Sequence, residues 1–118
     1  MTEITRNEMS SHYGIPQRIL KEYERLGSRH PENGAEGRAV YSDQDLERLR
    51  LIMALYEGGF QKEEVERYMA LALDRTDTGA EQLAMLQKKR DGILHEIHLR
   101  EKQIDQLDYL RYGIRYAK

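Results

Sequence analysis

Three basic side chains recur at regular spacing in one short stretch of the 118-residue chain. Arg18, Lys21 and Arg25 stand at i, i+3 and i+7, so on an α-helix they share one face. Such side chains can bind phosphates, and an arginine can also form two hydrogen bonds to guanine. Gln17, just before them, can form paired hydrogen bonds to adenine. The pattern indicates a DNA-contacting helix whose first two polar residues read base edges, while Lys21 and Arg25 bind phosphates.

Ordinary solvated helix faces also carry basic residues at this spacing, and two acids, Glu22 and Glu24, lie among them. The whole chain has a net charge of −2, with the acidic excess in residues 1–79 and a small basic excess in residues 80–118. A basic domain is the usual electrostatic footprint of a nucleic-acid-binding protein. A DNA-binding interpretation therefore depends on local charge placement, and a coiled-coil adaptor that binds protein is the alternative.

The flanking residues place this segment in a helix-turn-helix. Residues 5–8 (TRNE) have the form of a capping box, which predicts a short helix ending near Gly14. Pro16 suits the first position of a second helix, which should run to about Leu26 and end at Gly27. Two helices joined by a glycine turn make this motif, and its second helix can enter the major groove.

Turn and cap residues divide the next part of the chain. Residues 28–41 predict a small hairpin or wing with a turn at Asn33-Gly34. Ser42 opens a third helix, which ends at Gly58-Gly59, and a fourth helix follows at about 62–73. The third helix should bury the apolar stripe Leu46, Leu49, Ile52, Met53 and Tyr56. The fourth should turn inward Val65, Met69, Ala72 and Leu73.

Residues 80–112 contain no proline and would form a helix of about 50 Å. Positions in alternating steps of three and four from Leu83 to Ile114 are aliphatic at seven of ten and arginine at the other three, which matches a heptad seam. The aliphatic seam residues are Leu83, Leu86, Ile93, Ile97, Ile104, Leu107 and Ile114. We expect self-association through this helix. A lone helix folded back onto its own domain is the alternative.

No residue cluster predicts an enzyme. The chain has no cysteine, which excludes disulfides and thiolate metal sites. His95 and His98 lie one helical turn apart near Asp91, but no fourth ligand is obvious. No glycine-rich phosphate loop or activated nucleophile stands out. We therefore expect no catalytic residue, no metal and no cofactor.

Three tyrosines gather near the end of the chain, at Tyr109, Tyr112 and Tyr116, on either side of Gly113. The simpler interpretation is that their rings pack against helices of a partner. The sharper one is a small pocket for an apolar or cationic effector, because the faces of tyrosine rings attract cations. No signal peptide or run of roughly 18 apolar residues is present, so no membrane association and a cytoplasmic location are expected.

The stretch GIPQRILKEYERLG, followed by VYSDQDLERLRLIMALYEGGFQKEEV and a long terminal helix, resembles the MerR family of bacterial transcription regulators. The resemblance covers residues 4–73 in order and spacing. It implies a mainly α fold with a winged helix-turn-helix DNA-binding domain in residues 1–73 and a linker in 74–79. Residues 80–118 would hold a dimerisation helix that pairs with its mate in an antiparallel coiled coil.

The same resemblance assigns roles by position. Arg18 falls at the recognition-helix arginine, Lys21 at a second basic residue and Tyr23 at a tyrosine that contacts phosphate. Tyr41 matches the tyrosine that closes the wing. Arg38 lies one residue before the position of the family's wing arginine.

The resemblance also implies a function. A homodimer would bind a pseudo-palindromic promoter in double-stranded DNA, then bend and untwist an over-long spacer so that RNA polymerase contacts both promoter elements. Distorting such a site costs on the order of 1–6 kcal/mol, offset by the added contacts. An architectural DNA-binding protein without promoter remodelling is a further alternative.

Overall fold

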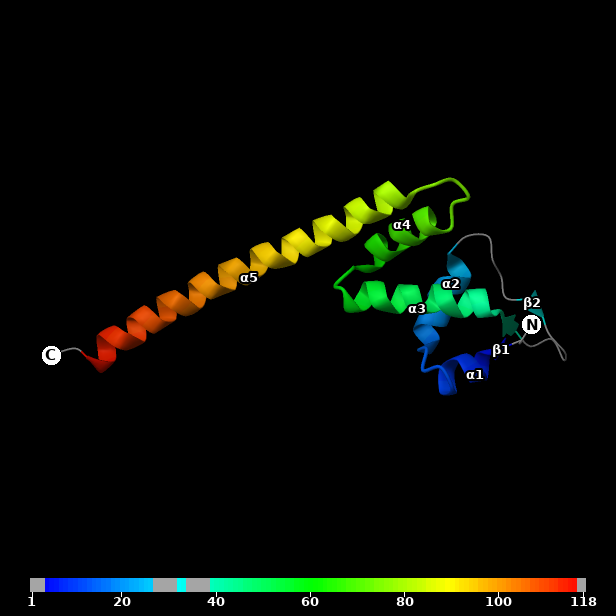
Figure 1. Cartoon of the computed structure of the whole chain (residues 1–118). Coiled ribbons are helices and arrows are strands. Elements are labelled where there is room, and N and C mark those ends of the chain that lie inside the picture. The colour runs from blue at the N-terminus through cyan, green and yellow to red at the C-terminus, as the bar shows by residue number, and fades with distance from the viewer. Residues whose placement is uncertain (1–3, 27–31, 34–38, 117–118) are drawn as a thin grey trace. The chain divides into compact units, whose positions relative to one another are not determined.

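The computed structural model describes residues 4–26, 32–33 and 39–116. The chain forms two compact units, residues 1–79 and 80–118. The first unit holds three short strands and four helices among its described residues, and the second is a single long helix (Figure 1). In chain order the elements are β1 (Ile4–Thr5), α1 (Arg6–Ser11), α2 (Gln17–Arg25), β2 (Glu32–Asn33), β3 (Ala39–Tyr41), α3 (Asp43–Glu57), α4 (Lys62–Ala72) and α5 (Gly79–Arg115).

Side-chain caps start two of the helices where the sequence predicts. The Thr5 hydroxyl accepts from the Glu8 amide at 3.1 Å, which confirms the predicted capping box of α1. Ser42 and Asp45 form the same reciprocal pair at the start of α3. Pro16 sits one residue earlier than expected, at the N-cap of α2. Its ψ of 146° is extended, and its carbonyl already accepts from the amide of Leu20 at 3.2 Å.

Two glycines make the turns that separate the helices. Gly14 has φ +68° between α1 and α2, and Gly59 has φ +91° between α3 and α4. Other residue types rarely adopt this left-handed conformation, so both turns require glycine. The predicted stop at Gly27 lies outside the described residues.

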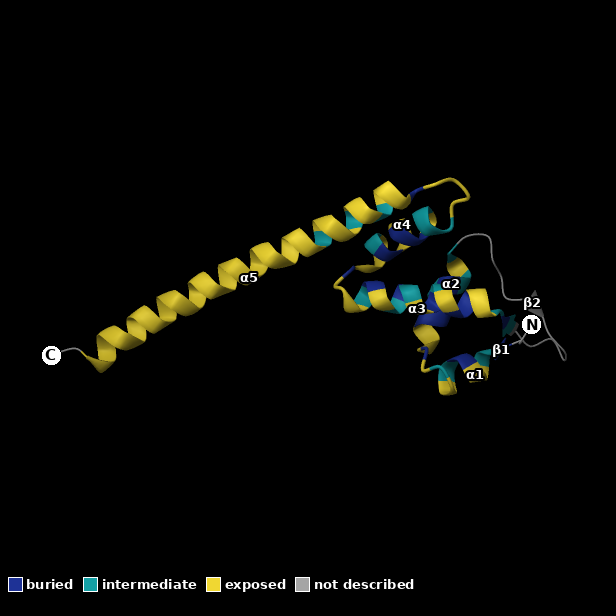
Figure 2. Ribbon diagram, in the orientation of Figure 1, coloured by how far each residue is buried: buried dark blue, intermediate teal, exposed yellow. Residues whose placement is uncertain are grey.

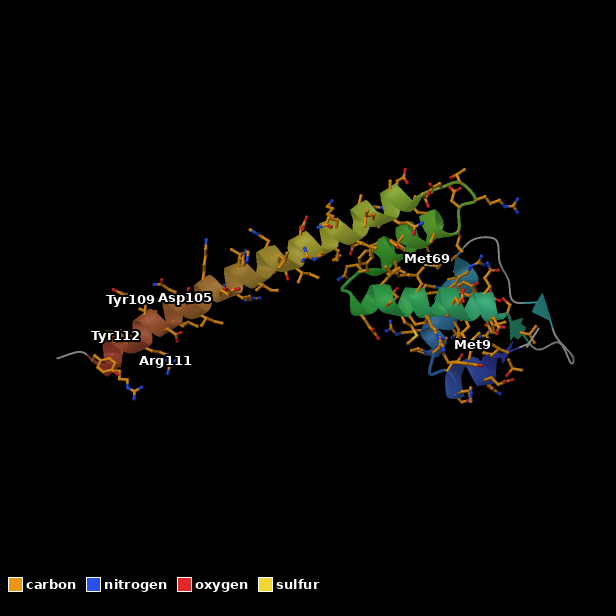
Figure 3. The ribbon with its side chains drawn as sticks, viewed as in Figure 1. Met9, Met69, Asp105, Tyr109, Arg111 and Tyr112 are labelled. Atoms are coloured by element: carbon orange, nitrogen blue, oxygen red, sulfur yellow. The ribbon has the colours of Figure 1, made fainter. Side chains whose placement is uncertain are left out.

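The core of the first unit lies where helices α1 to α4 meet (Figure 2). Met9 from α1 and Met69 from α4 are both fully buried, and they are labelled in Figure 3. The ring of Phe60 meets that of Tyr68 edge-on, with centroids 6.0 Å apart. Each fully buried aliphatic side chain contributes about 1.5–3 kcal/mol to folding.

Two predicted apolar stripes need correction. On α3 the buried residues include Leu55, whereas Tyr56 and Met53 are only half-buried. The buried aliphatic residues of α3 follow steps of three, at Leu46, Leu49, Ile52 and Leu55. On α4 the inward residues are Val65, Tyr68 and Met69, while Ala72 and Leu73 lie at the half-exposed end of the helix.

A three-stranded antiparallel sheet has the order β1-β3-β2. The pairs Ile4↔Tyr41 and Asn33↔Ala39 set its register. The β2–β3 pairing confirms the predicted hairpin, although Gly34 and Arg38 lie outside the described residues. Strand β1 was not predicted, because it has only two residues, of which the second is the N-cap of α1, and so short a segment carries no alternation signal.

Helix α5 is longer than predicted, since it continues through Gly113 to Arg115. A glycine costs a helix only about 1 kcal/mol, and one glycine does not end it without a favourable alternative for the backbone. No residue of α5 is buried, as Figure 2 shows. Among the described residues, no helix combines the length and apolar character that a bilayer span needs.

Candidate nucleic-acid interface

Helix α2 separates its polar and apolar residues cleanly. Ile19, Leu20 and Tyr23 are buried against the core. The exposed residues are Gln17, Arg18, Lys21 and Arg25, which are four of the five α2 residues predicted to contact DNA. The preceding turn holds the start of α2 in place, because the Ile15 amide donates to the Met9 carbonyl at 3.0 Å. The structure therefore presents one basic surface on α2, and the contacts of this surface with DNA stay a prediction.

The acid at Glu24 is neutralised by a neighbouring helix. Its carboxylate pairs with the guanidinium of Arg6 at the start of α1. The same oxygen accepts a hydrogen bond from the Tyr41 hydroxyl at 2.6 Å. Both partners are at least half-buried, so this carboxylate is tied into the fold of the domain. Glu24 thus subtracts less from the basic surface than the sequence suggests.

The acid at Glu22 is also engaged. Its Oε2 atom accepts from the Tyr56 hydroxyl of α3 at 2.6 Å. The ring of Tyr56 in turn lies 5.7 Å from the guanidinium carbon of Arg18. Burial, together with the bond to Glu22, raises the pKa of Tyr56 to about 12, so its hydroxyl keeps the donated proton at neutral pH.

The two tyrosines predicted to serve DNA are core residues in this structure. Tyr23 is 4% exposed, and its hydroxyl donates to Asp45 of α3. Tyr41 is 2% exposed, and the same combination of burial and a carboxylate partner raises its pKa. Neither hydroxyl is free for a phosphate in the structure. Both residues position α2, and their direct contact with DNA stays a prediction.

Asp45 joins the cap of α3 to α2. One of its oxygens accepts from the Ser42 amide at 2.8 Å and from the Ser42 hydroxyl at 3.0 Å. The other accepts from Tyr23, whose pKa is raised to about 12 by burial and by this carboxylate. The sequence pattern predicts only that Asp45 lies in the first turn of a helix, so its link to α2 is a finding of the structure.

Replacing Tyr23 with phenylalanine should lower the free energy of unfolding by about 1–3 kcal/mol, because the buried Asp45 carboxylate loses a donor. The folded pKa of Tyr23 is raised, so its stabilising effect is present below pH 10 and is lost as the pH rises towards 12. Urea unfolding at pH 7 and pH 11 should therefore show a smaller alkaline loss of stability in the variant. Tyr13→Phe, in the α1–α2 turn, is the control. If wild type and Tyr23→Phe lost equal free energy of unfolding between pH 7 and pH 11, the Tyr23 hydroxyl would not be the stabilising group.

The predicted seam of α5 is open to solvent. Its aliphatic residues are between 40% and 83% exposed, with Ile93 the least and Ile114 the most accessible. Burying such a surface in one chain would require a second element along the whole helix. This finding agrees with a helix that needs a partner, and the pairing itself stays a prediction.

The terminal tyrosines do not surround a single pocket. Tyr112 and Tyr116 stack at a slant, with ring centroids 4.6 Å apart. They help to line an open hollow of about 450 Å³ with Asp108, Arg111, Ile114 and Arg115. Tyr109 lies outside that lining and is 72% exposed; Figure 3 labels it on α5 with Tyr112. A pocket for an effector at this end stays a prediction.

The described residues contain no group of three or more histidine, aspartate or glutamate side chains placed to hold a metal ion. His95 and His98 are exposed on α5, without the third ligand that a site would need.

Residues 4–72 match the model of the MerR HTH family regulatory proteins, which is more than half of the chain. The chain belongs to the MerR family. Among curated relatives, the HTH-type transcriptional regulator HmrR of Rhizobium leguminosarum bv. viciae is 29% identical over 100 residues. That match covers 85% of this chain and 74% of HmrR.

Solved MerR-family structures share the fold. The crystal structure of HiNmlR, a MerR family regulator lacking the sensor domain and bound to promoter DNA, superposes with a TM-score of 0.65 at 20% identity. The superposed region covers 98% of this chain and 93% of HiNmlR. A MerR family regulator from Bacillus cereus gives a TM-score of 0.66 at 19% identity, covering 99% and 86% of the two chains. The winged helix-turn-helix and long helix predicted from the sequence are thus confirmed, and the chain is a DNA-binding transcriptional regulator of this family.

Sequence reasoning missed three residues of this MerR-family interface: Arg6, Asp45 and Tyr56. All three act on α2 from other helices. A signal for Asp45 existed, because it is the third helical residue after the Ser42 cap. Arg6 and Tyr56 carried no local signal, since their partners Glu24 and Glu22 are 18 and 34 residues away.

Proposed function

We propose that this regulator binds a pseudo-palindromic promoter as a homodimer, through the exposed face of α2. One observation carries the proposal: the face presents only basic and amide side chains, while both acids of α2 are engaged by partners. Arg6 balances the charge of Glu24, and the charge of Glu22 offsets only one of the three cations of α2, so the local charge is positive despite the net charge of −2. The electric field of this local surface, and not the net charge of the whole chain, then steers the approach of DNA.

The four exposed side chains of α2 divide by position. Gln17 and Arg18 stand in its first turn, the part of a recognition helix that reaches base edges in the major groove. Gln17 would pair with adenine, and Arg18 with guanine. Lys21 and Arg25 lie further along the helix, where contacts go to phosphates and add affinity without sequence choice.

The exposed seam of α5 supplies the reason for a homodimer. Two copies of a 37-residue helix, packed antiparallel through the same seam, would bury the aliphatic side chains that one copy leaves in water. A symmetric pair of domains suits an inverted repeat in DNA. Joining two weak half-site contacts in one dimer raises the affinity well beyond that of either domain.

Distortion of the promoter spacer is the proposed outcome of binding. The family resemblance supports a mechanism in which the dimer bends and untwists the spacer, so that RNA polymerase meets both promoter elements. The promoter-bound HiNmlR structure shares this fold, which supports promoter DNA as the partner. No catalytic step is part of the proposal, and neither is a cofactor. A small-molecule effector at the tyrosine end of α5 is compatible with it.

Selection of bound fragments from random DNA tests the proposal most directly. We expect an enriched inverted repeat, and binding to it should weaken steeply with salt. The logarithm of the binding constant should fall by about 0.9 per neutralised phosphate for each unit of log salt concentration. A protein-binding adaptor would enrich no sequence and show no such slope. An architectural protein would bind without unwinding the spacer when polymerase is present.

A further inference from the structure

Tyr56 of α3 contacts two residues of the recognition helix at once. Its hydroxyl donates to Glu22 at 2.6 Å, and the guanidinium carbon of Arg18 lies 5.7 Å from its ring centroid. We propose that Tyr56 is a positioning residue for DNA reading, which orients Arg18 and holds Glu22 away from it. The inference depends on the proposed role of Arg18 at a base edge.

The ring restricts a side chain that is otherwise free. Arg18 is exposed, and an exposed arginine samples many rotamers in solution. A guanidinium over an aromatic face is held by the negative charge density of the ring while its hydrogen-bond donors stay available at the edge. Arg18 thus loses less side-chain conformational entropy when it enters the major groove.

The hydroxyl removes a competitor of the DNA. Glu22 is four residues after Arg18 on the same helix, the spacing at which opposite charges pair directly. Such a pair would occupy the donors that Arg18 needs for a guanine. In the structure the Glu22 carboxylate accepts from Tyr56 instead. The raised pKa of Tyr56 keeps this donor protonated across the pH range of ordinary binding measurements.

Glu22 and Tyr56 depend on each other in this arrangement. The ring next to Arg18 belongs to Tyr56 of α3, and Glu22 anchors this ring by accepting a hydrogen bond from its hydroxyl. The two residues therefore act as one unit, so substitutions at the two positions should not be additive.

Two variants separate the ring from the hydroxyl. Tyr56→Phe keeps the ring but releases Glu22, and should weaken binding to the selected site by about 2- to 5-fold per dimer. Tyr56→Leu removes both and should weaken it by about 5- to 30-fold, because each dimer carries two such contacts. Adding Glu22→Gln to Tyr56→Phe should restore most of the loss. Thermal melting of each variant checks that the domain stays folded.

The decisive readout is selectivity in a double-mutant cycle. Binding is measured to the selected site and to a site changed at the base pair that Arg18→Ala identifies. Tyr56→Leu should reduce the ratio of the two affinities, and it should have no further effect in the Arg18→Ala background. Equal losses in both backgrounds, or an unchanged ratio in a folded Tyr56→Leu protein, would overturn the inference. An Arg18→Ala protein with unchanged binding would instead overturn the proposed function.

Discussion

Replacing Ile97 and Ile104 together with aspartate should convert the proposed dimer into a monomer and abolish binding to the full promoter site. Both residues lie in the seam of α5, and they are 46% and 57% exposed in the single chain. Two carboxylates per chain in a packed seam would be desolvated, which costs several kcal/mol for each ion without a good partner. Sedimentation and a gel-shift titration of the same samples would measure both losses.

Aspartates on the outer side of the same helix are the matched control. His95→Asp and Gln106→Asp carry the same new groups at positions off the seam, and both residues are exposed in α5. This control protein should stay dimeric and keep its affinity for DNA. If the Ile97/Ile104 variant is still a dimer, the seam is placed on the wrong side of α5. If it is a monomer that binds the whole site normally, the coupling between half-sites is absent.

Arg18→Ala should weaken binding by about 1–3 kcal/mol per half-site and relax base choice at one position of each. The reason is that a paired contact from a guanidinium to guanine discriminates against the other bases. Competition binding against sites substituted at every position would show where discrimination is lost. The affected positions should be related by the symmetry of the inverted repeat.

Lys21→Ala is the comparison for Arg18→Ala, since it removes a neighbouring charge on the same exposed face. It should weaken all sequences by a similar factor and reduce the salt slope by about one unit per site contacted. Unchanged affinity in both variants would mean that α2 does not face the DNA. A change of base preference in Lys21→Ala alone would reverse the proposed roles of the two residues.

Local chemistry made much of the fold predictable. The caps at Thr5 and Ser42 require only residues three positions apart, so their pattern is visible in the sequence. The turn at Gly59 and the long terminal helix follow from backbone preferences of the same short range, although the helix runs past its predicted end to Arg115. These signals do not depend on how the helices pack. Four exposed residues of α2 were predicted for the same reason, because helical periodicity alone separates the two sides.

Long-range partners explain what could not be predicted. Tyr23, Tyr41 and Tyr56 each donate to a carboxylate between 17 and 34 residues away. Tyrosine occurs both in cores and on surfaces, so the sequence did not show whether these hydroxyls bind a phosphate of DNA or a carboxylate of the protein. The predicted buried stripe of α3 omitted Leu55 for a similar reason. Which residue of a neighbouring pair is buried depends on the elements that pack against the helix, and the local pattern does not reveal these.

Asp45 limits how this regulator can be redirected to new promoters. Because the Asp45 carboxylate both caps the start of α3 and accepts from the Tyr23 hydroxyl, a transplanted α2 must carry tyrosine at 23 to keep that hydrogen bond. Reprogramming is therefore confined to the outward positions of α2, such as Gln17 and Arg18. A library that varies only those sites should retain folded members, whereas one that also randomises residue 23 should lose most of them.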